Sequence, residues 1–132
     1  MSVLLDTHAL LWWLLEERRL SPRQRRAVRA ASPEDPLLVS DFTLQEIATL
    51  VELRRVELDV PVRDWLEQAT APPLVRVLPI GAAVAAEVAA LPPGFHRDPA
   101  DRIIVSTARV FAAALLTSDR RIIDSGLVSI IS

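Results

Sequence analysis

The sequence predicts an α/β sandwich built on a parallel sheet, and two observations favour this fold class. Short apolar runs alternate along the chain with segments of helical periodicity, as they do where helices connect parallel strands. These runs are also continuously apolar, which is typical of strands that are buried on both faces. With 132 residues and 51% hydrophobic side chains, we expect residues 1–132 to form one domain with a sizeable core.

Five segments have the composition of buried strands, because they are short, rich in Val, Leu and Ile, and bounded by turn or cap residues. The predicted strands are residues 2–5, 37–40, 74–79, 114–117 and 128–131. We therefore expect a mostly parallel, five-stranded sheet.

Helix start signals lie between the predicted strands. The sequence SPRQ at Ser21–Gln24 offers a capping serine, a proline at the first helical position and a glutamine that completes a capping box. The sequence TLQE, from Thr43 to Glu46, is a second candidate capping box. Asp98 precedes a proline and starts a long helical segment. Helical periodicity also marks residues 62–69 and 81–91.

Composition excludes several classes of function. The chain has no cysteine, which excludes disulfides and thiolate metal sites and favours a cytoplasmic location. All 15 basic residues are arginine, which excludes P-loop, Schiff-base and receiver-domain chemistry, since each of these uses a lysine. No apolar run approaches the roughly 20 residues of a membrane span, and we expect no signal peptide.

Acidic residues follow the predicted strands at the points where ligands bind in open parallel sheets. Asp6 follows the first strand and Asp119 the fourth, while Glu46 lies early in the helix after the second strand. Asp98 and Asp101 lie at the start of the last long helix. Right-handed crossovers bring strand ends to one edge of the sheet, so we expect these carboxylates to converge there.

Each of these acids also has a simpler structural interpretation. Asp98 and Asp119 have the residue type of helix N-caps, and Glu46 could complete a capping box with Thr43. Asp101 could favour the positive end of a helix dipole. The neighbours of Glu46 and Asp101 at helical spacing are apolar, however, which favours a buried site over a solvated helix face.

Converging carboxylates require a cation. Two unit charges 4 Å apart repel by roughly 4 kcal/mol at an effective dielectric constant of 20. The groups must therefore bind protons or metal ions, and ligation by oxygen alone selects Mg²⁺ or Mn²⁺. Such a site suits the hydrolysis of phosphodiesters.

The net charge of −2 is compatible with this substrate, because the five acids account for the negative balance. Without them the chain has an excess of three positive charges. Six arginines between residues 18 and 29 either follow a phosphate backbone or form a solvated helix face. Arg102, beside Asp101, is predicted to contact substrate phosphate or to brace the carboxylates.

Two adjacent tryptophans, Trp12 and Trp13, follow the first strand. They are separated by about 100° on a helix, so both cannot face one core. We expect one to pack inside and the other to lie at a dimer or partner surface. Stacking on a nucleic-acid base is the alternative.

Four motifs together resemble PIN-domain proteins of the VapC toxin type. They are LLDTHALLWWL, VSDFTLQEI, HRDPADRIIVSTA and LLTSDRRI, and they occur in the order and spacing of that family over nearly the whole chain. The resemblance implies a three-layer α/β/α sandwich and a ribonuclease that depends on Mg²⁺ or Mn²⁺ and leaves 5′-phosphate and 3′-hydroxyl ends. It also implies a cognate antitoxin protein as partner and a homodimer.

The resemblance also assigns site residues. The catalytic and metal-binding quartet of the family falls on Asp6, Glu46, Asp101 and Asp119, with Asp98 as an additional candidate ligand. Thr7 and Ser118 match positions whose hydroxyls support the acids or bound waters. Ala100 departs from the family pattern, which often has a bulky aromatic residue at that position, and this difference is expected to reshape the floor of the pocket.

Two alternatives remain open. A PIN-fold protein that has lost catalysis would act only as an interaction module, but four costly carboxylates argue against it. A structure-specific DNA nuclease of the related flap-cleaving type would need an arch for which 132 residues leave no room.

Overall fold

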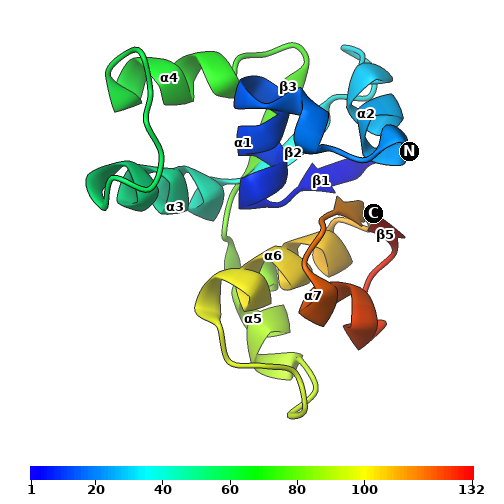
Figure 1. The fold of residues 1–132 in the computed structure, drawn as a ribbon. Helices are drawn as coiled ribbons and strands as arrows, with labels where there is room; N and C mark the ends of the chain where they lie inside the picture. The colour runs from blue at the N-terminus through cyan, green and yellow to red at the C-terminus, as the bar shows by residue number, and fades with distance from the viewer.

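A computed structural model describes residues 1–132 and has the predicted architecture (Figure 1). The strands are β1 (Val3–Leu5), β2 (Leu37–Ser40), β3 (Val75–Leu78), β4 (Ala114–Leu116) and β5 (Ile130–Ile131). The helices are α1 (Thr7–Leu15), α2 (Pro22–Arg29), α3 (Asp41–Glu52), α4 (Val62–Ala69), α5 (Ala82–Ala90), α6 (Pro99–Val110) and α7 (Arg120–Ser125), with one 3₁₀ turn, η1 (Glu17–Arg19). No helix is long and apolar enough to cross a membrane.

The five strands form one sheet in the order β3-β2-β1-β4-β5. Every neighbouring pair is parallel. The β1 strand is central, and Leu5 pairs with Val39 of β2 on one side and with Leu116 of β4 on the other. The carboxyl ends of β1, β2 and β4 therefore lie together at one edge of the sheet, as predicted.

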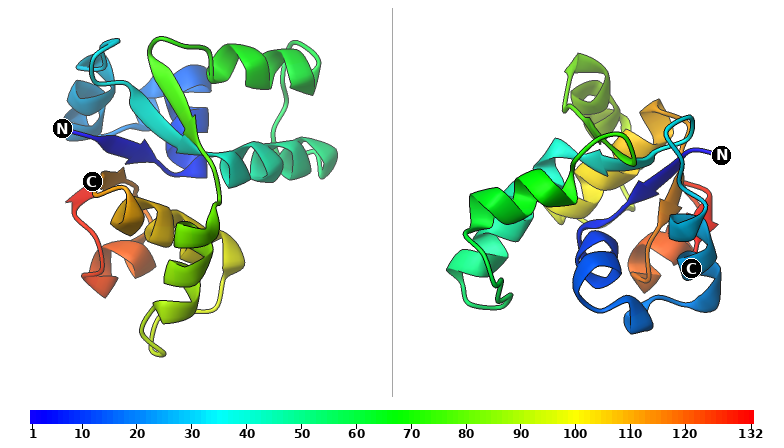
Figure 2. Two further views of the ribbon diagram at one scale, coloured as in Figure 1. Left: turned by 180° about the vertical axis from the view of Figure 1, so that it is seen from behind. Right: turned by 90° about the horizontal axis from the view of Figure 1, so that it is seen from above.

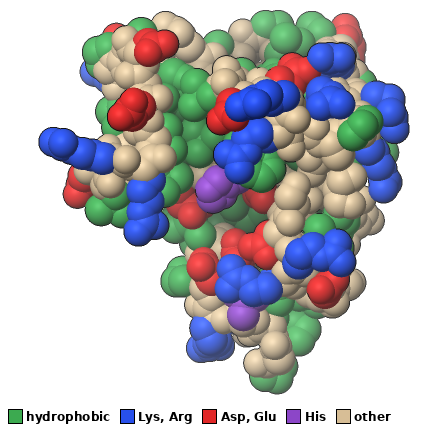
Figure 3. All heavy atoms as spheres, in the orientation of Figure 1, with side chains coloured by type: hydrophobic (Ala, Val, Ile, Leu, Met, Phe, Trp, Pro, Cys, Tyr) green, Lys and Arg blue, Asp and Glu red, His purple; other side chains and the backbone are tan.

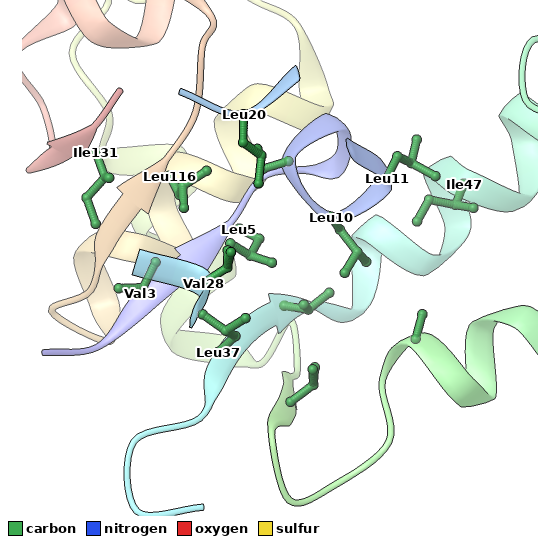
Figure 4. Packing of buried hydrophobic residues seen from close by; sticks show 14 of the residues in the cluster. Val3, Leu5, Leu10, Leu11, Leu20, Val28, Leu37, Ile47, Leu116 and Ile131 are labelled. Carbon is green, nitrogen blue, oxygen red and sulfur yellow. The ribbon is translucent and has the colours of Figure 1, made fainter. Parts of the chain in front are cut away.

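Helices cover both faces of the sheet, which confirms the three-layer α/β/α fold (Figures 1 and 2). Val3 and Leu5 point to the face that α1 to α4 cover and join a cluster that includes Leu10 and Ile47 (Figure 4). Leu4 points to the opposite face and joins a cluster with residues of α6 and α7 and with Leu91, the C-cap of α5. Because β1 is buried on both faces, its sequence is continuously apolar.

One of the two predicted capping boxes is present. The backbone N–H of Gln24 donates to Ser21 Oγ, and the backbone N–H of Ser21 donates to Gln24 Oε1, both at 3.1 Å. The prediction for Thr43 and Glu46 is wrong, because α3 begins three residues earlier and Ser40 is its N-cap. Thr43 and Glu46 consequently lie inside the helix, with their side chains free to serve the site.

Gln24 also ties α2 to the carboxyl edge of the sheet. Its buried amide donates to the carbonyl oxygens of Thr117 at 3.2 Å and of Ile131 at 3.3 Å, and to Ser118 Oγ at 3.2 Å. A single side chain thereby satisfies polar groups after β4 and in β5, beside the segment that carries Asp119.

We predict that Gln24→Leu lowers the free energy of unfolding by roughly 1–3 kcal/mol, because it leaves buried carbonyl groups without a donor. Urea denaturation followed by circular dichroism measures the change. Gln68→Leu, at an exposed position of α4, is the matched control and should change stability by less than about 0.5 kcal/mol. Equal effects of the two substitutions would contradict this role for Gln24.

Candidate active site

The five predicted acids line one groove. This groove has a volume of about 940 Å³, and its walls include Asp6, Glu46, Asp98, Asp101 and Asp119. They come from the end of β1, from α3, from the start of α6 and from the segment after β4. Figure 3 shows acidic side chains gathered in a hollow at the middle of this face, with arginines above and below them.

Asp6 serves as a helix cap and as a wall of the groove at the same time. Its Oδ1 accepts a hydrogen bond of 2.7 Å from the backbone N–H of Ala9, and its Oδ2 accepts one of 2.5 Å from the hydroxyl of Thr117. Burial raises the pKa of Asp6 above its usual value, and these two hydrogen bonds oppose the increase because they stabilise the ionised form.

Glu46 is held by a buried pair of threonines. The hydroxyl of Thr7 donates to Glu46 Oε1 at 2.5 Å and lies 3.2 Å from the hydroxyl of Thr43. Burial raises the pKa of Glu46, and the negative charges of Asp98 and Asp6 raise it further. Thr7 therefore contacts a carboxylate, as expected, although Thr43 was not anticipated as its neighbour.

Asp98 and Asp119 cap the two helices that meet at the groove. Asp98 Oδ1 accepts hydrogen bonds from the backbone N–H groups of Ala100, at 3.0 Å, and Asp101, at 3.3 Å. Asp119 Oδ1 accepts one of 2.9 Å from the backbone N–H of Arg121. The structural interpretation is therefore confirmed for both residues, and because both caps also line the groove, it does not exclude a role in the site.

Asp101 lies at the start of α6 and has a strongly raised pKa. Burial, together with the charges of Asp98 and Asp119, raises its pKa to about 7. His96 Nε2 lies 3.3 Å from Asp101 Oδ2 and forms an ion pair with it when the imidazole is protonated. Close to neutral pH, this carboxyl group is therefore only partly ionised without a further positive charge nearby.

Arg121 supplies positive charge to the site, a role that was not predicted from the sequence. One guanidinium nitrogen, Nη2, lies 3.4 Å from Asp101 Oδ2 and 3.5 Å from Asp119 Oδ2. The position of Arg121, two residues after the capping Asp119, is the only signal in the sequence that points to it.

Two predicted site residues do not have their expected roles. Arg102 is 8% exposed, and its guanidinium donates to the backbone carbonyls of Val88, Phe95 and His96. It braces the segment before α6 and does not line the groove, so the prediction of a phosphate contact is wrong. Ser118 lines the groove but bonds to Gln24, and the neighbouring Thr117 supports Asp6 in its place.

The aromatic end of the groove lies along α1. Trp12 and Trp13 are both half-buried against the core cluster on that face, in contrast to the expected division into one inner and one outer ring. Trp12 lines the groove, and the guanidinium of Arg19 stacks over its ring at 4.7 Å. Ala100 also lines the groove, as expected.

The donor atoms fit a hard divalent cation. They are carboxylate oxygens with hydroxyls behind them. Burial, and to a lesser extent neighbouring negative charge, raises the pKa of three of the carboxyl groups, and a bound cation would oppose this increase. No three acidic or histidine side chains are close enough, as placed, to enclose an ion. The carboxylate oxygens instead contact threonine hydroxyls and Arg121. Binding of an ion therefore requires the carboxylate side chains to rotate.

The sequence model of the PIN domain matches residues 3–126. The chain belongs to the PIN domain family. Among curated proteins, this PIN domain is 41% identical to "Ribonuclease VapC22" of Mycobacterium tuberculosis (strain ATCC 25618 / H37Rv) over 121 residues, covering 92% of the chain and 89% of that protein.

Solved structures share the fold at lower identity. VapBC2 from Rickettsia felis, bound to a DNA fragment from its promoter, has a TM-score of 0.73 at 12% identity, with 98% of this chain and 97% of that chain covered. FitAcB from Neisseria gonorrhoeae has a TM-score of 0.70 at 22% identity, with 98% and 96% covered. A toxin-antitoxin complex from Klebsiella pneumoniae has a TM-score of 0.66 at 19% identity, with 99% and 97% covered.

The raised pKa of Asp101 predicts how the stability of the metal-free PIN domain depends on pH. A carboxyl group whose pKa rises from 3.8 to about 7 on folding stabilises the fold fully below pH 4, and this contribution is lost as the pH rises through 7. The melting temperature should fall by roughly 5 °C between pH 5 and pH 8.

Differential scanning fluorimetry in EDTA measures this dependence. Asp101→Asn should flatten the profile, whereas Asp64→Asn, at an exposed position of α4, should leave it unchanged. A melting temperature that stays constant or rises over this range would show that Asp101 titrates normally.

Proposed function

We propose that this PIN domain is a divalent-metal-dependent endoribonuclease and the toxin of a toxin–antitoxin pair. One observation carries the proposal: acids from four separate elements line a single groove, and three of them have raised pKa values. The relationship to Ribonuclease VapC22 supports RNA as the substrate.

Asp6, Glu46, Asp101 and Asp119 are the proposed metal-binding and catalytic residues, with Asp98 as an additional ligand. Dependence on a divalent metal is general to PIN-domain VapC ribonucleases. We propose Mg²⁺ or Mn²⁺, because hard cations of this size bind carboxylate and water oxygens. When bound, the ion would lower the pKa of a coordinated water and neutralise charge on the phosphodiester.

The protein's own residues prepare the groove for this chemistry. Thr117 and the backbone of Ala9 hold both oxygens of Asp6, and Thr7 holds Glu46, so both carboxylates lie at the wall of the groove before an ion binds. The capping bonds of Asp98 and Asp119 hold the opposite wall. Leu11, Leu50 and Ile104 contribute apolar surface to the walls of the groove.

The proposal also covers the protein partner, the domain content and the oligomeric state. We propose a cognate antitoxin as the protein partner, since structures with this fold include VapBC and other toxin-antitoxin complexes. We further propose that residues 1–132 form a single domain and that the protein is a homodimer. An RNA substrate favours action in the cytoplasm.

We predict that Asp6→Asn and Asp119→Asn each reduce RNA cleavage by about 100-fold or more, because each removes a charged ligand from the proposed centre. Cleavage of a labelled single-stranded RNA in Mg²⁺ or Mn²⁺ measures the rate. Asp64→Asn, away from the groove, should retain the wild-type rate.

Calorimetric titration with Mn²⁺ separates this proposal from an inactive interaction module. The wild-type protein should bind the ion, and Asp6→Asn should bind it at least about tenfold more weakly. A folded wild-type protein that neither binds Mn²⁺ nor cleaves RNA would overturn the enzymatic proposal and favour the interaction module.

A further inference from the structure

Among the arginines that line the groove, Arg121 alone reaches the carboxylates. The other two are Arg19, whose guanidinium stacks on Trp12, and Arg55. Arg121 Nη2 lies between Asp101 and Asp119, at 3.4 Å and 3.5 Å from their Oδ2 atoms. A guanidinium therefore occupies the space between two proposed metal ligands.

The contact of Arg121 with Asp101 and Asp119 can neutralise their charge, but it holds the Arg121 side chain only weakly. A strong charge-assisted hydrogen bond has a length of about 2.7–2.9 Å, and neither contact of Arg121 is that short. The Arg121 side chain is 61% exposed, whereas those of Asp101 and Asp119 are 18% and 28% exposed. Solvent weakens an ion pair of this kind, so a divalent cation can displace it.

Arg121 also has room to leave the two carboxylates without leaving the site. Its side chain lines a second pocket of about 410 Å³, which adjoins the groove and whose walls include His96 and Ser125. Since the guanidinium is a planar fork that matches phosphate geometry, a phosphate at the mouth of the groove would be a better partner than solvent.

We propose that Arg121 is an internal counter-cation that neutralises Asp101 and Asp119 in the metal-free protein and moves to an RNA phosphate once a divalent ion is bound. The inference rests on the proposed function. It makes Arg121 a competitor of the metal and a ligand of the substrate, so its removal should affect the two binding events in opposite directions.

The first test is Mn²⁺ binding without RNA, measured by calorimetry on folded protein. Arg121→Gln should bind Mn²⁺ about three- to tenfold more tightly than wild type, because the competing charge is gone. Arg120→Gln is the matched control: Arg120 is the adjacent residue, its removal changes the net charge equally, and it pairs with Asp124 outside the groove. The control should bind within about twofold of wild type.

The second test is the binding of a fluorescein-labelled single-stranded RNA, with Ca²⁺ in place of Mg²⁺ and with RNA integrity checked on a gel. Arg121→Gln should bind RNA more weakly, and the slope of log affinity against log salt should fall in magnitude by about 0.7, as expected for one lost phosphate contact. Arg121→Lys, which keeps the charge, should recover most of the affinity, and Arg120→Gln should match wild type.

Each outcome decides a separate part of the inference. Equal Mn²⁺ affinities of Arg121→Gln and Arg120→Gln would overturn the counter-cation role. Tighter Mn²⁺ binding with an unchanged salt slope for RNA would overturn the transfer to phosphate. A wild-type protein that binds no Mn²⁺ would overturn the proposed function itself, whatever the variants do.

Discussion

The energetic cost of holding several carboxylates together out of water explains most features of this structure. Asp6, Glu46 and Asp101 all have raised pKa values, with burial as the main cause and neighbouring negative charge as a further one. Hydroxyl donors, and for Asp6 a backbone N–H at a helix N-terminus, offset part of this cost for Asp6 and Glu46. The groove therefore lacks positive charge, and a divalent cation can supply it.

The fold brings these groups together because β1 is the central strand. It pairs with β2 on one side and β4 on the other, so the segments that follow all three strands lie at the same edge. The apolar side chains of β1 enter the clusters on both faces, which fixes its register and therefore the position of Asp6. Packing of the core and placement of the acids thus depend on the same residues.

The fold class and the convergence of the acids could be predicted from the sequence, because both follow from periodicity and from the place of each acid after a strand or at a helix start. The partners of individual side chains could not. Thr117 and Ser118 are adjacent hydroxyl residues, and only the direction of the chain after β4 decides that Thr117 meets Asp6. Arg102 neighbours Asp101 in sequence, yet the helix turns it inward to backbone carbonyls, while Arg121 approaches from a different helix.

The pairing of β1 with β4 has a consequence for biosynthesis. Asp6 and Thr117 are 111 positions apart in the chain and are joined by a side-chain hydrogen bond. The outer side of β4 pairs with β5, which comes later still. A nascent polypeptide on the ribosome therefore exposes Asp6 and Glu46 well before the residues that complete the groove exist. A chain whose synthesis stops before β4 would lack Thr117 and Asp119, so it would be released without the assembled centre.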